Sequence, residues 1–420
     1  MNLKKIKLSH LLLFAAFLYL SFQAFRNVAV AAVVMATLAM RNISQPGLAV
    51  RTEKTALPAA VVFLLFMLGF IISVSSGGYY IKNRLSISPG FGAAWEKFPR
   101  GAISFIKDKG LQGSFYNDNF SGGFFLWECY PERKVFFDGR WEGYSKEFLG
   151  EFHRLSQNPG AFGEYADKYG FKYVLLSHFS PESRKLFPLL FKDGGWILAF
   201  IDESASVFVR KGLAGLKAAR PETDMKEKPA SGWPLYLNYF QRAVILQNAG
   251  LYEFARKDYE RALEILPSYH EAANNSGYTW AMQGNYEKAA EFYLRALEIK
   301  KSYAPAKFNL GYSYYRLGRY KQAINALKNH RALSPGNKRD AFIITAECNL
   351  KTGNYRETIE NCKRAIKTDG NLPAAYNLMG IAYGKQALYT EALEVFKAAA
   401  AKFPGNEAII KNLRNMKHVK

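Results

Sequence analysis

Apolar residues follow three different patterns along the chain. Residues 8–40 and 56–75 form two long apolar blocks, and the second contains no charged residue. Residues 80–211 alternate short strand-like runs with helical patterns, and from 236 to 406 a helical pattern recurs every ~34 residues. These patterns predict a multidomain chain with a membrane segment (1–79), an α/β domain (80–211), a linker (212–235), five helical repeats (236–406) and a capping helix (407–420).

The two apolar blocks predict transmembrane helices. Residues 56–75 match the roughly 20 residues that a helix needs to cross a bilayer. The first block predicts either two short spans, at 8–25 and 27–40, or one tilted span. A signal peptide at 1–25 is the alternative, but no small-residue cleavage site precedes a polar segment. Because Arg41, Arg51 and Lys54 outnumber Glu53 in the intervening loop, that loop is expected in the cytoplasm and the later residues outside.

The middle of the chain predicts alternating helices and strands. Helices are expected at 98–109, 122–130, 146–156, 162–169 and 181–191, and strands at 113–116, 134–138, 173–177, 196–202 and 206–210. Such alternation favours a layered α/β fold. The predicted sheet is mostly parallel, and the last two strands form an antiparallel hairpin at its edge.

The repeated helical pattern keeps small and aromatic residues at fixed offsets. In the second unit these are Gly277, Gly284, Tyr286, Ala289, Tyr293 and Ala296. Small residues let two helices approach closely, and aromatic residues fill the gaps between neighbouring hairpins. The pattern resembles the tetratricopeptide repeat, a helical hairpin that stacks into an all-α solenoid. The fourth unit fits least well, and one extra residue near Lys338 brings it into register.

The first helix of each repeat supplies candidates for a concave peptide-binding face. The side chains expected there are Tyr239, Arg242, Asn274, Asn275, Lys307, Asn309, Tyr312 and Asn377. Asparagine amides at such positions can hydrogen-bond the backbone of a bound peptide. The alternative for half of the set is that they are ordinary solvated polar residues. The expected partner of the array is a protein or peptide.

Polar residues also gather after two predicted strands of the middle domain. Asn117, Asp118 and Asn119 follow one strand, and Asp138 and Arg140 end the next. Ligands of α/β sheets bind at strand ends, and arginine offers bidentate contacts to a phosphate, so a sugar or phosphate site is predicted. The alternative is that Asp138 and Arg140 pair with each other and fix a turn.

The run from Ser114 to Arg140 contains the segments Asn-Phe-Ser-Gly-Gly and Val-Phe-Phe-Asp-Gly-Arg. It resembles the extracytoplasmic C-terminal region of bacterial GT-C glycosyltransferases, which use polyprenyl-phosphate-linked sugars, and the resemblance extends over residues 10–211. It implies a bacterial inner-membrane protein with residues after 76 on the periplasmic or outer side. The partners that it implies are the lipid bilayer, a lipid-linked glycan and a glycosyltransferase subunit. Enzymes of that class have many more spans and acidic residues in an external loop, which this chain lacks.

These observations predict a membrane-anchored, extracytoplasmic scaffold whose repeats recruit a protein partner in a glycosyltransferase or cell-envelope complex. No catalytic residue is assigned. The alternative is a GT-C-type lipid-linked sugar transferase, or the C-terminal half of one.

Charge and cysteine content bear on which partners and metal sites the sequence predicts. The net charge is +22, and residues 233–420 hold 28 Lys and Arg against 16 Asp and Glu. A basic array can attract anionic partners, but a solvated basic face explains the excess equally well, and no nucleic acid partner is predicted. Cys129, Cys348 and Cys362 have no metal-ligand spacing, so buried free thiols without metal or cofactor are expected. His178 has no nucleophile at a familiar spacing and is expected at the surface.

Overall fold

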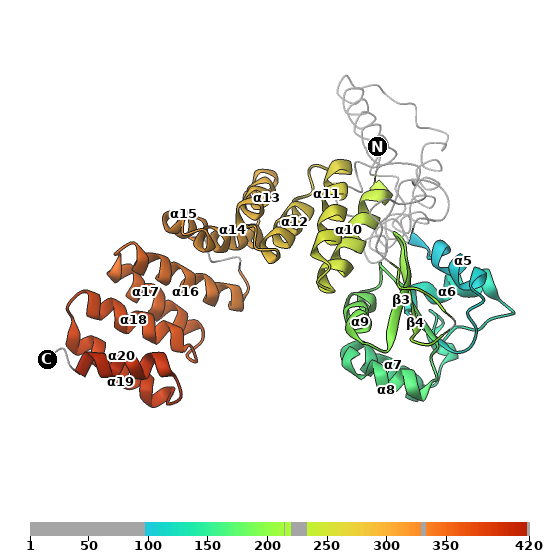
Figure 1. The fold of residues 1–420 in the computed structure, drawn as a ribbon, viewed down its shortest axis with the longest axis horizontal. Coiled ribbons are helices and arrows are strands. Elements are labelled where there is room, and N and C mark those ends of the chain that lie inside the picture. The colour runs from blue at the N-terminus through green and yellow to red at the C-terminus, as the bar shows by residue number, and fades with distance from the viewer. Residues whose placement is uncertain (1–96, 214, 220–232, 329–332, 418–420) are drawn as a thin grey trace, which may run out of the picture. The chain divides into compact units, whose positions relative to one another are not determined.

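The computed structural model describes residues 97–213, 215–219, 233–328 and 333–417 (Figure 1). The chain divides into two compact units, Met1–Tyr79 and Tyr80–Lys420, and every described residue belongs to the second. Within these ranges no helix combines the length and the apolar character that a membrane crossing requires. The predicted fold class is therefore corrected, because its N-terminal transmembrane helices find no support. The spans expected at 8–25, 27–40 and 56–75 lie outside the described residues.

The α/β part contains a four-stranded sheet. Its strands are β1 (Phe115–Asn117), β2 (Tyr173–Ser177), β3 (Trp196–Ile201) and β4 (Ala205–Arg210), in the order β1-β2-β4-β3. Only β1 and β2 pair in parallel, whereas β4 is antiparallel to both β2 and β3. The predicted mostly parallel sheet is wrong because β4, the second strand of the hairpin, pairs along the whole of β2.

Helices cover both faces of this sheet. They are α5 (Arg100–Asp108), α6 (Asn119–Cys129), α7 (Lys146–Gln157), α8 (Phe162–Lys168) and α9 (Pro181–Lys192), with short 3-10 turns at Trp141–Gly143 and Pro159–Ala161. Side chains alternate along a strand, so Tyr173 and Leu175 pack with α5 and α6 while Val174 and Leu176 pack with α7, α8 and α9. The result is a three-layer α/β/α arrangement in which β2 is buried throughout.

The segment 134–138 is a loop and not the predicted strand. The Asn117 side chain supplies the hydrogen bonds that a neighbouring strand would have made. Its Oδ1 accepts from the Phe136 N–H at 2.9 Å, and its Nδ2 donates to the Phe137 carbonyl at 2.6 Å. Gly122 on α6 allows this approach, since a Cβ there would lie 2.0 Å from the Phe137 carbonyl oxygen.

The rest of the described chain is a series of helical hairpins. The helices are α10 (Trp233–Asn248), α11 (Tyr252–Ile265), α12 (His270–Met282), α13 (Tyr286–Ile299), α14 (Ala304–Arg316), α15 (Tyr320–Ala326), α16 (Pro335–Lys351), α17 (Tyr355–Thr368), α18 (Pro373–Lys385), α19 (Tyr389–Lys402) and α20 (Glu407–Lys417). Each odd-numbered helix up to α19 packs on the helix before it, and α20 packs on α19 (Figure 1). The predicted all-α solenoid is confirmed.

Small residues set the spacing of the hairpins. A Cβ on Gly277 of α12 would lie 2.8 Å from the ring of Tyr293 on α13, so only glycine fits there. The turn between these helices uses Gly284 at a φ of +82°, and the equivalent turn of the last hairpin uses Ala387 at +60°. The three cysteines are free and buried, as expected.

Candidate functional site

Asp118 lies at the end of β1, where the sequence predicts a ligand. Its Oδ1 accepts the backbone N–H groups of Phe120 and Ser121, both at 2.9 Å, and so caps the N-terminus of α6. Its Oδ2 accepts the Ser177 N–H at 2.5 Å and the Ser183 hydroxyl at 3.3 Å. Burial raises the pKa of Asp118 to about 6, against the lowering effect of these backbone N–H groups. Both carboxylate oxygens are therefore occupied by the protein itself.

Asp138 and Arg140 form an ion pair on the loop that Asn117 holds. Arg140 Nε and Nη2 reach Asp138 Oδ2 at 3.0 and 2.5 Å, and the Asp138 N–H donates to the Tyr144 hydroxyl at 3.0 Å. The Asp138 side chain is 2% exposed and that of Arg140 is 76% exposed. Hydrogen bonds from Arg140 lower the pKa of Asp138. This geometry favours the alternative in which the pair fixes the turn.

The structure thus brings three of the five predicted residues, Asn117, Asp118 and Asp138, to buried positions around the end of β1. Asn119 is the exposed first residue of α6, and Arg140 faces solvent next to Asp138. The polar atoms of Asn117 and Asp118 bind mainly backbone groups, and the Asp138 carboxylate is held by Arg140. A sugar or phosphate site here stays a prediction, and the described contacts account for these residues as supports of a loop.

His178 is fully buried, so the expectation of a surface histidine is wrong. Its Nε2 lies 2.7 Å from the Ser206 hydroxyl and its Nδ1 lies 3.3 Å from the Glu203 carbonyl oxygen. The residue follows β2 directly, and the turn between β3 and β4 folds over it, with the His178 N–H donating to the Ser204 carbonyl at 2.7 Å. Burial, and then the charge of Arg242, lower the pKa of His178 to about 3, so the ring is neutral.

Three residues expected on the concave face of the repeats are buried instead, namely Tyr239, Arg242 and Asn274. Arg242 on α10 forms a bidentate ion pair with Asp258 on α11, through Nε–Oδ2 and Nη2–Oδ1 distances of 2.7 Å. The two side chains are 3% and 2% exposed, and Tyr239 is 8% exposed. A carboxylate on the facing helix compensates the arginine, which is why a charged residue can occupy this interior position.

Other predicted residues form a chain of hydrogen bonds across successive helices. Asn309 Nδ2 donates to Asn274 Oδ1 at 3.1 Å, Asn274 Nδ2 donates to Asn275 Oδ1 at 3.1 Å, and Asn275 Nδ2 donates to the Tyr259 hydroxyl at 3.3 Å. Asn412 Nδ2 donates to Asn377 Oδ1 at 2.7 Å in the same way. Asn274 is buried, whereas Asn275, Asn309 and Asn377 are half-buried and can still present part of the amide to a ligand.

The first helices of the hairpins lie next to one another as a row. Helices α12, α14, α16, α18 and α20 contact each other in that order, and we call them the first-helix row. Side chains bridge its members, since Asn309 binds Asn274 and the Tyr315 hydroxyl donates to Glu347. Of the predicted residues, Lys307 and Tyr312 are half-buried on this row.

The sequence interpretation missed a partly exposed strip, mostly of tyrosines, on α12, α14 and the start of α13. We define the aromatic strip as Tyr278, Met282, Tyr286, Tyr312 and Arg316. Tyr278 is 37% and Met282 47% exposed, and the rings of Tyr286 and Tyr312 lie 6.3 Å apart. The recurrence of tyrosine one repeat period apart, at Tyr278 and Tyr312, was the available signal.

No group of three or more His, Cys, Asp or Glu side chains in the described ranges is placed to hold a metal ion. Asp118 and His178, whose pKa values are shifted by burial, both have hydrogen-bond partners within the protein. The first-helix row, with its half-buried amides and the exposed Tyr278, is the candidate functional surface.

Comparison with known proteins identifies the repeats. A family model described as "TPR repeat" matches residues 277–318, and one described as "Tetratricopeptide repeat" matches residues 308–373. No curated protein matches the chain.

Solved structures resemble the chain only at low sequence identity and low TM-score. YrrB, titled a TPR protein with an unusual peptide-binding site, is 21% identical, with 42% of this chain and 90% of that chain covered and a TM-score of 0.40. MamA from Desulfovibrio magneticus RS-1 is 14% identical, with 42% and 99% covered and a TM-score of 0.38. Pseudomonas aeruginosa pilF is 21% identical, with 44% and 84% covered and a TM-score of 0.38. At such TM-scores none of these likenesses carries an argument about function.

Neither family model concerns a glycosyltransferase, so the resemblance of residues 10–211 to GT-C enzymes stays a prediction. For the helical array, by contrast, three observations agree on the same assignment. They are the repeat spacing, the stacked hairpins and both family models. Residues 277–373 are tetratricopeptide repeats.

Proposed function

We propose that the array is an interaction scaffold that holds a segment of a partner protein along the first-helix row. The observation that carries this proposal is the continuity of the row. Hydrogen bonds from Asn309 to Asn274 and from Tyr315 to Glu347 join α12, α14 and α16 directly. A ligand that lies across the helices therefore meets one preformed surface.

The side chains of that surface suit a polypeptide. Half-buried amides at Asn275 and Asn309 can donate to and accept from a peptide backbone. Tyr278 and Tyr312 add ring surface and hydroxyl groups at equivalent positions of neighbouring helices, and tyrosine supplies large contact area at low entropic cost. Stacked repeats commonly use an extended surface of this kind for binding.

The test compares one double variant and one single variant of the full chain. Tyr278→Ala with Tyr312→Ala removes the two rings from the row, while Leu294→Ala removes a 43% exposed apolar side chain from the second helix α13. Proteins crosslinked to each tagged variant in the native host are quantified against the unchanged chain. We expect the double variant to lose at least about fivefold of one specific partner, because tyrosines at a binding centre dominate affinity.

The control should retain that partner and its melting temperature, since substitution of an exposed residue costs within about 0.5 kcal/mol. Because Tyr312 is half-buried, the melting temperature of the double variant is measured as well, to confirm that it is folded. If every crosslinked protein is recovered equally with the double variant and with the unchanged chain, the row is not the binding surface.

A further inference from the structure

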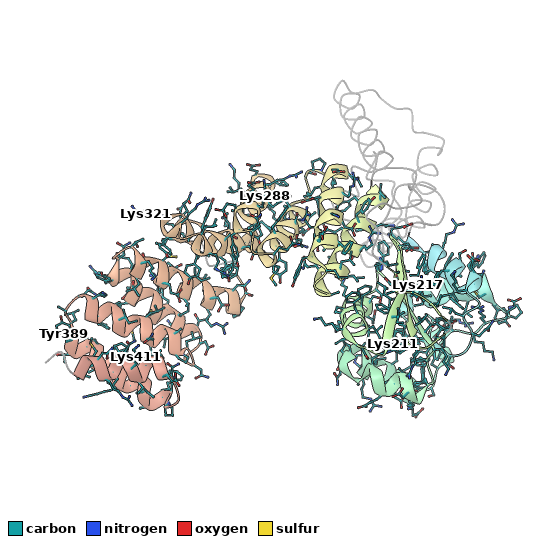
Figure 2. All side chains as sticks on the ribbon, in the orientation of Figure 1. Lys211, Lys217, Lys288, Lys321, Tyr389 and Lys411 are labelled. Carbon is teal, nitrogen blue, oxygen red and sulfur yellow. The ribbon has the colours of Figure 1, made fainter. Side chains whose placement is uncertain are left out.

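The third hairpin, α14 and α15, lies in a part of the array without acidic residues. From Lys300 to Arg339 inclusive the sequence holds ten Lys and Arg and no Asp or Glu. Arg319 is compensated by Glu287 of the preceding hairpin at 3.3 Å, but Lys307 and Lys321 form no ion pair with any described residue. Lys321 is exposed at the start of α15 (Figure 2). This hairpin therefore carries uncompensated positive charge.

Arg316, at the end of α14, is held by aromatic rings and not by a carboxylate. Its guanidinium lies over the ring of Tyr286, 4.5 Å from the centroid, and its Nη1 donates to the Tyr312 hydroxyl at 2.9 Å. The side chain is exposed, and its other guanidinium N–H groups have no hydrogen-bond partner among the described residues. The two tyrosines thus fix a planar cation whose remaining donors face outward to solvent.

A guanidinium that is held in one orientation, with N–H groups open to solvent, is suited to bind a carboxylate. Arginine binds carboxylates through two parallel N–H bonds, and a group that is already oriented loses less entropy when those bonds form. Contact with the Tyr286 ring covers one side of the guanidinium, which reduces its hydration. The excess of positive charge on α14 and α15 adds attraction for an anion.

We infer that Arg316 anchors a carboxylate subsite and that the partner segment on the first-helix row is acidic. This inference rests on the proposed scaffold function and adds the chemistry of the partner. Asp or Glu side chains of that segment would meet Arg316 directly and the lysines of the third hairpin at longer range.

The same geometry disfavours single-stranded nucleic acid as the occupant. Such ligands gain affinity by stacking bases on open aromatic faces. Here the face of Tyr286 is covered by Arg316, and Tyr312 is half-buried. The Arg316 end of the strip therefore offers hydrogen-bond donors, which suit carboxylates and peptide groups.

The experiment measures fluorescence anisotropy of labelled peptides with the full chain at low and at physiological salt. One peptide, of about a dozen residues, carries Glu at every second position between Leu and Ala, and its match carries Gln at those positions. We expect the Glu peptide to bind at least about tenfold more tightly than the Gln peptide, because charge-assisted hydrogen bonds are about twice as strong as neutral ones.

Three variants localise the effect. Arg316→Gln should weaken binding of the Glu peptide about tenfold, and Arg316→Lys should restore only part of it, since lysine keeps the charge but not the bidentate geometry. Arg319→Gln is the matched control, because it removes an arginine of the same hairpin that already has a carboxylate partner, and it should leave the affinity unchanged. Melting temperatures of all variants are compared to exclude unfolding.

Equal binding of the two peptides, no binding of either, or unchanged affinity in Arg316→Gln would overturn the inference. A single-stranded oligonucleotide of the same charge serves as a competitor, and tighter binding of it that depends on Arg316 would replace the acidic peptide by nucleic acid. The scaffold function fails separately, through the tyrosine variants and their crosslinked partner.

Discussion

Arg242 and Asp258 join α10 and α11 through a bidentate ion pair that is almost completely buried, with both nitrogen–oxygen distances at 2.7 Å. A buried pair of this kind is costly to break from one side only, because the surviving charge is left without water or partner. It therefore fixes how the two helices of the first hairpin meet.

Asp258→Ala should destabilise the folded chain by about 3 to 5 kcal/mol, since it leaves the Arg242 charge buried and unpaired. Replacing both residues, with Arg242→Met and Asp258→Leu, should restore much of the loss. Urea unfolding followed by circular dichroism measures both. The control is Lys257→Ala, which removes an exposed pair with Glu253 and should cost no more than about 1 kcal/mol. A double variant less stable than Asp258→Ala would contradict this account.

His178 should make the fold sensitive to acid. Burial lowers its pKa from the ordinary 6.5 to about 3, so between these values the unfolded chain binds a proton that the folded chain does not. Stability contributed by the neutral ring is complete above pH 6.5 and is lost as the pH falls toward 3, at up to about 1.4 kcal/mol per pH unit. Unfolding midpoints measured from pH 7 to pH 4 should show a steeper decline for the unchanged chain than for His178→Gln. Parallel curves would rule out this titration as the cause.

Gly277→Ala tests the close approach of α12 and α13. The added Cβ would lie 2.8 Å from the Tyr293 ring, so the substitution should destabilise the array by about 1 to 3 kcal/mol through overpacking. Gly336→Ala, in the first turn of α16, is the control, because a Cβ there meets nothing within 4 Å and alanine favours helix. Thermal unfolding should therefore show opposite shifts, and a lower midpoint for the control would count against the steric reason.

Ala387 occupies a turn position that favours glycine. Its φ of +60° lies in the left-handed region, where a residue with a Cβ is disfavoured by about 1 to 2 kcal/mol. Ala387→Gly should raise the melting temperature, and Gly353→Ala, at a φ of +81° in the preceding hairpin, should lower it. Calorimetry of the two variants measures both melting temperatures. A shift of both in the same direction would contradict the backbone explanation.

The sequence was most informative where local pattern and packing agree. The strand Tyr173–Ser177 matches its predicted range because its apolar run is buried on both faces, and the tetratricopeptide spacing follows from residues such as Gly277 that touch the partner helix. Both are properties of contiguous residues or of a fixed period.

Long-range partners were not predictable in the same way. The apolar run 134–138 resembles a strand. Its backbone groups, however, hydrogen-bond to the Asn117 side chain and not to a neighbouring strand, and no local sequence pattern indicates such a contact. Arg242 looks like a surface residue until Asp258 is placed against it. The carboxylate of Asp118 looks like a ligand group, but three backbone N–H groups, one of them at Ser177, already bind it.

Helix α15 has seven residues, whereas α13, α17 and α19 each have 14. A helix half as long offers its neighbours less apolar surface, and α15 meets α16 over a smaller interface than α13 meets α14. Because the stability of a stack is close to a sum of neighbouring interfaces, the array has a mechanical weak point there. Under tension along the chain, we expect the stack to separate first at α15, between its second and fourth hairpins.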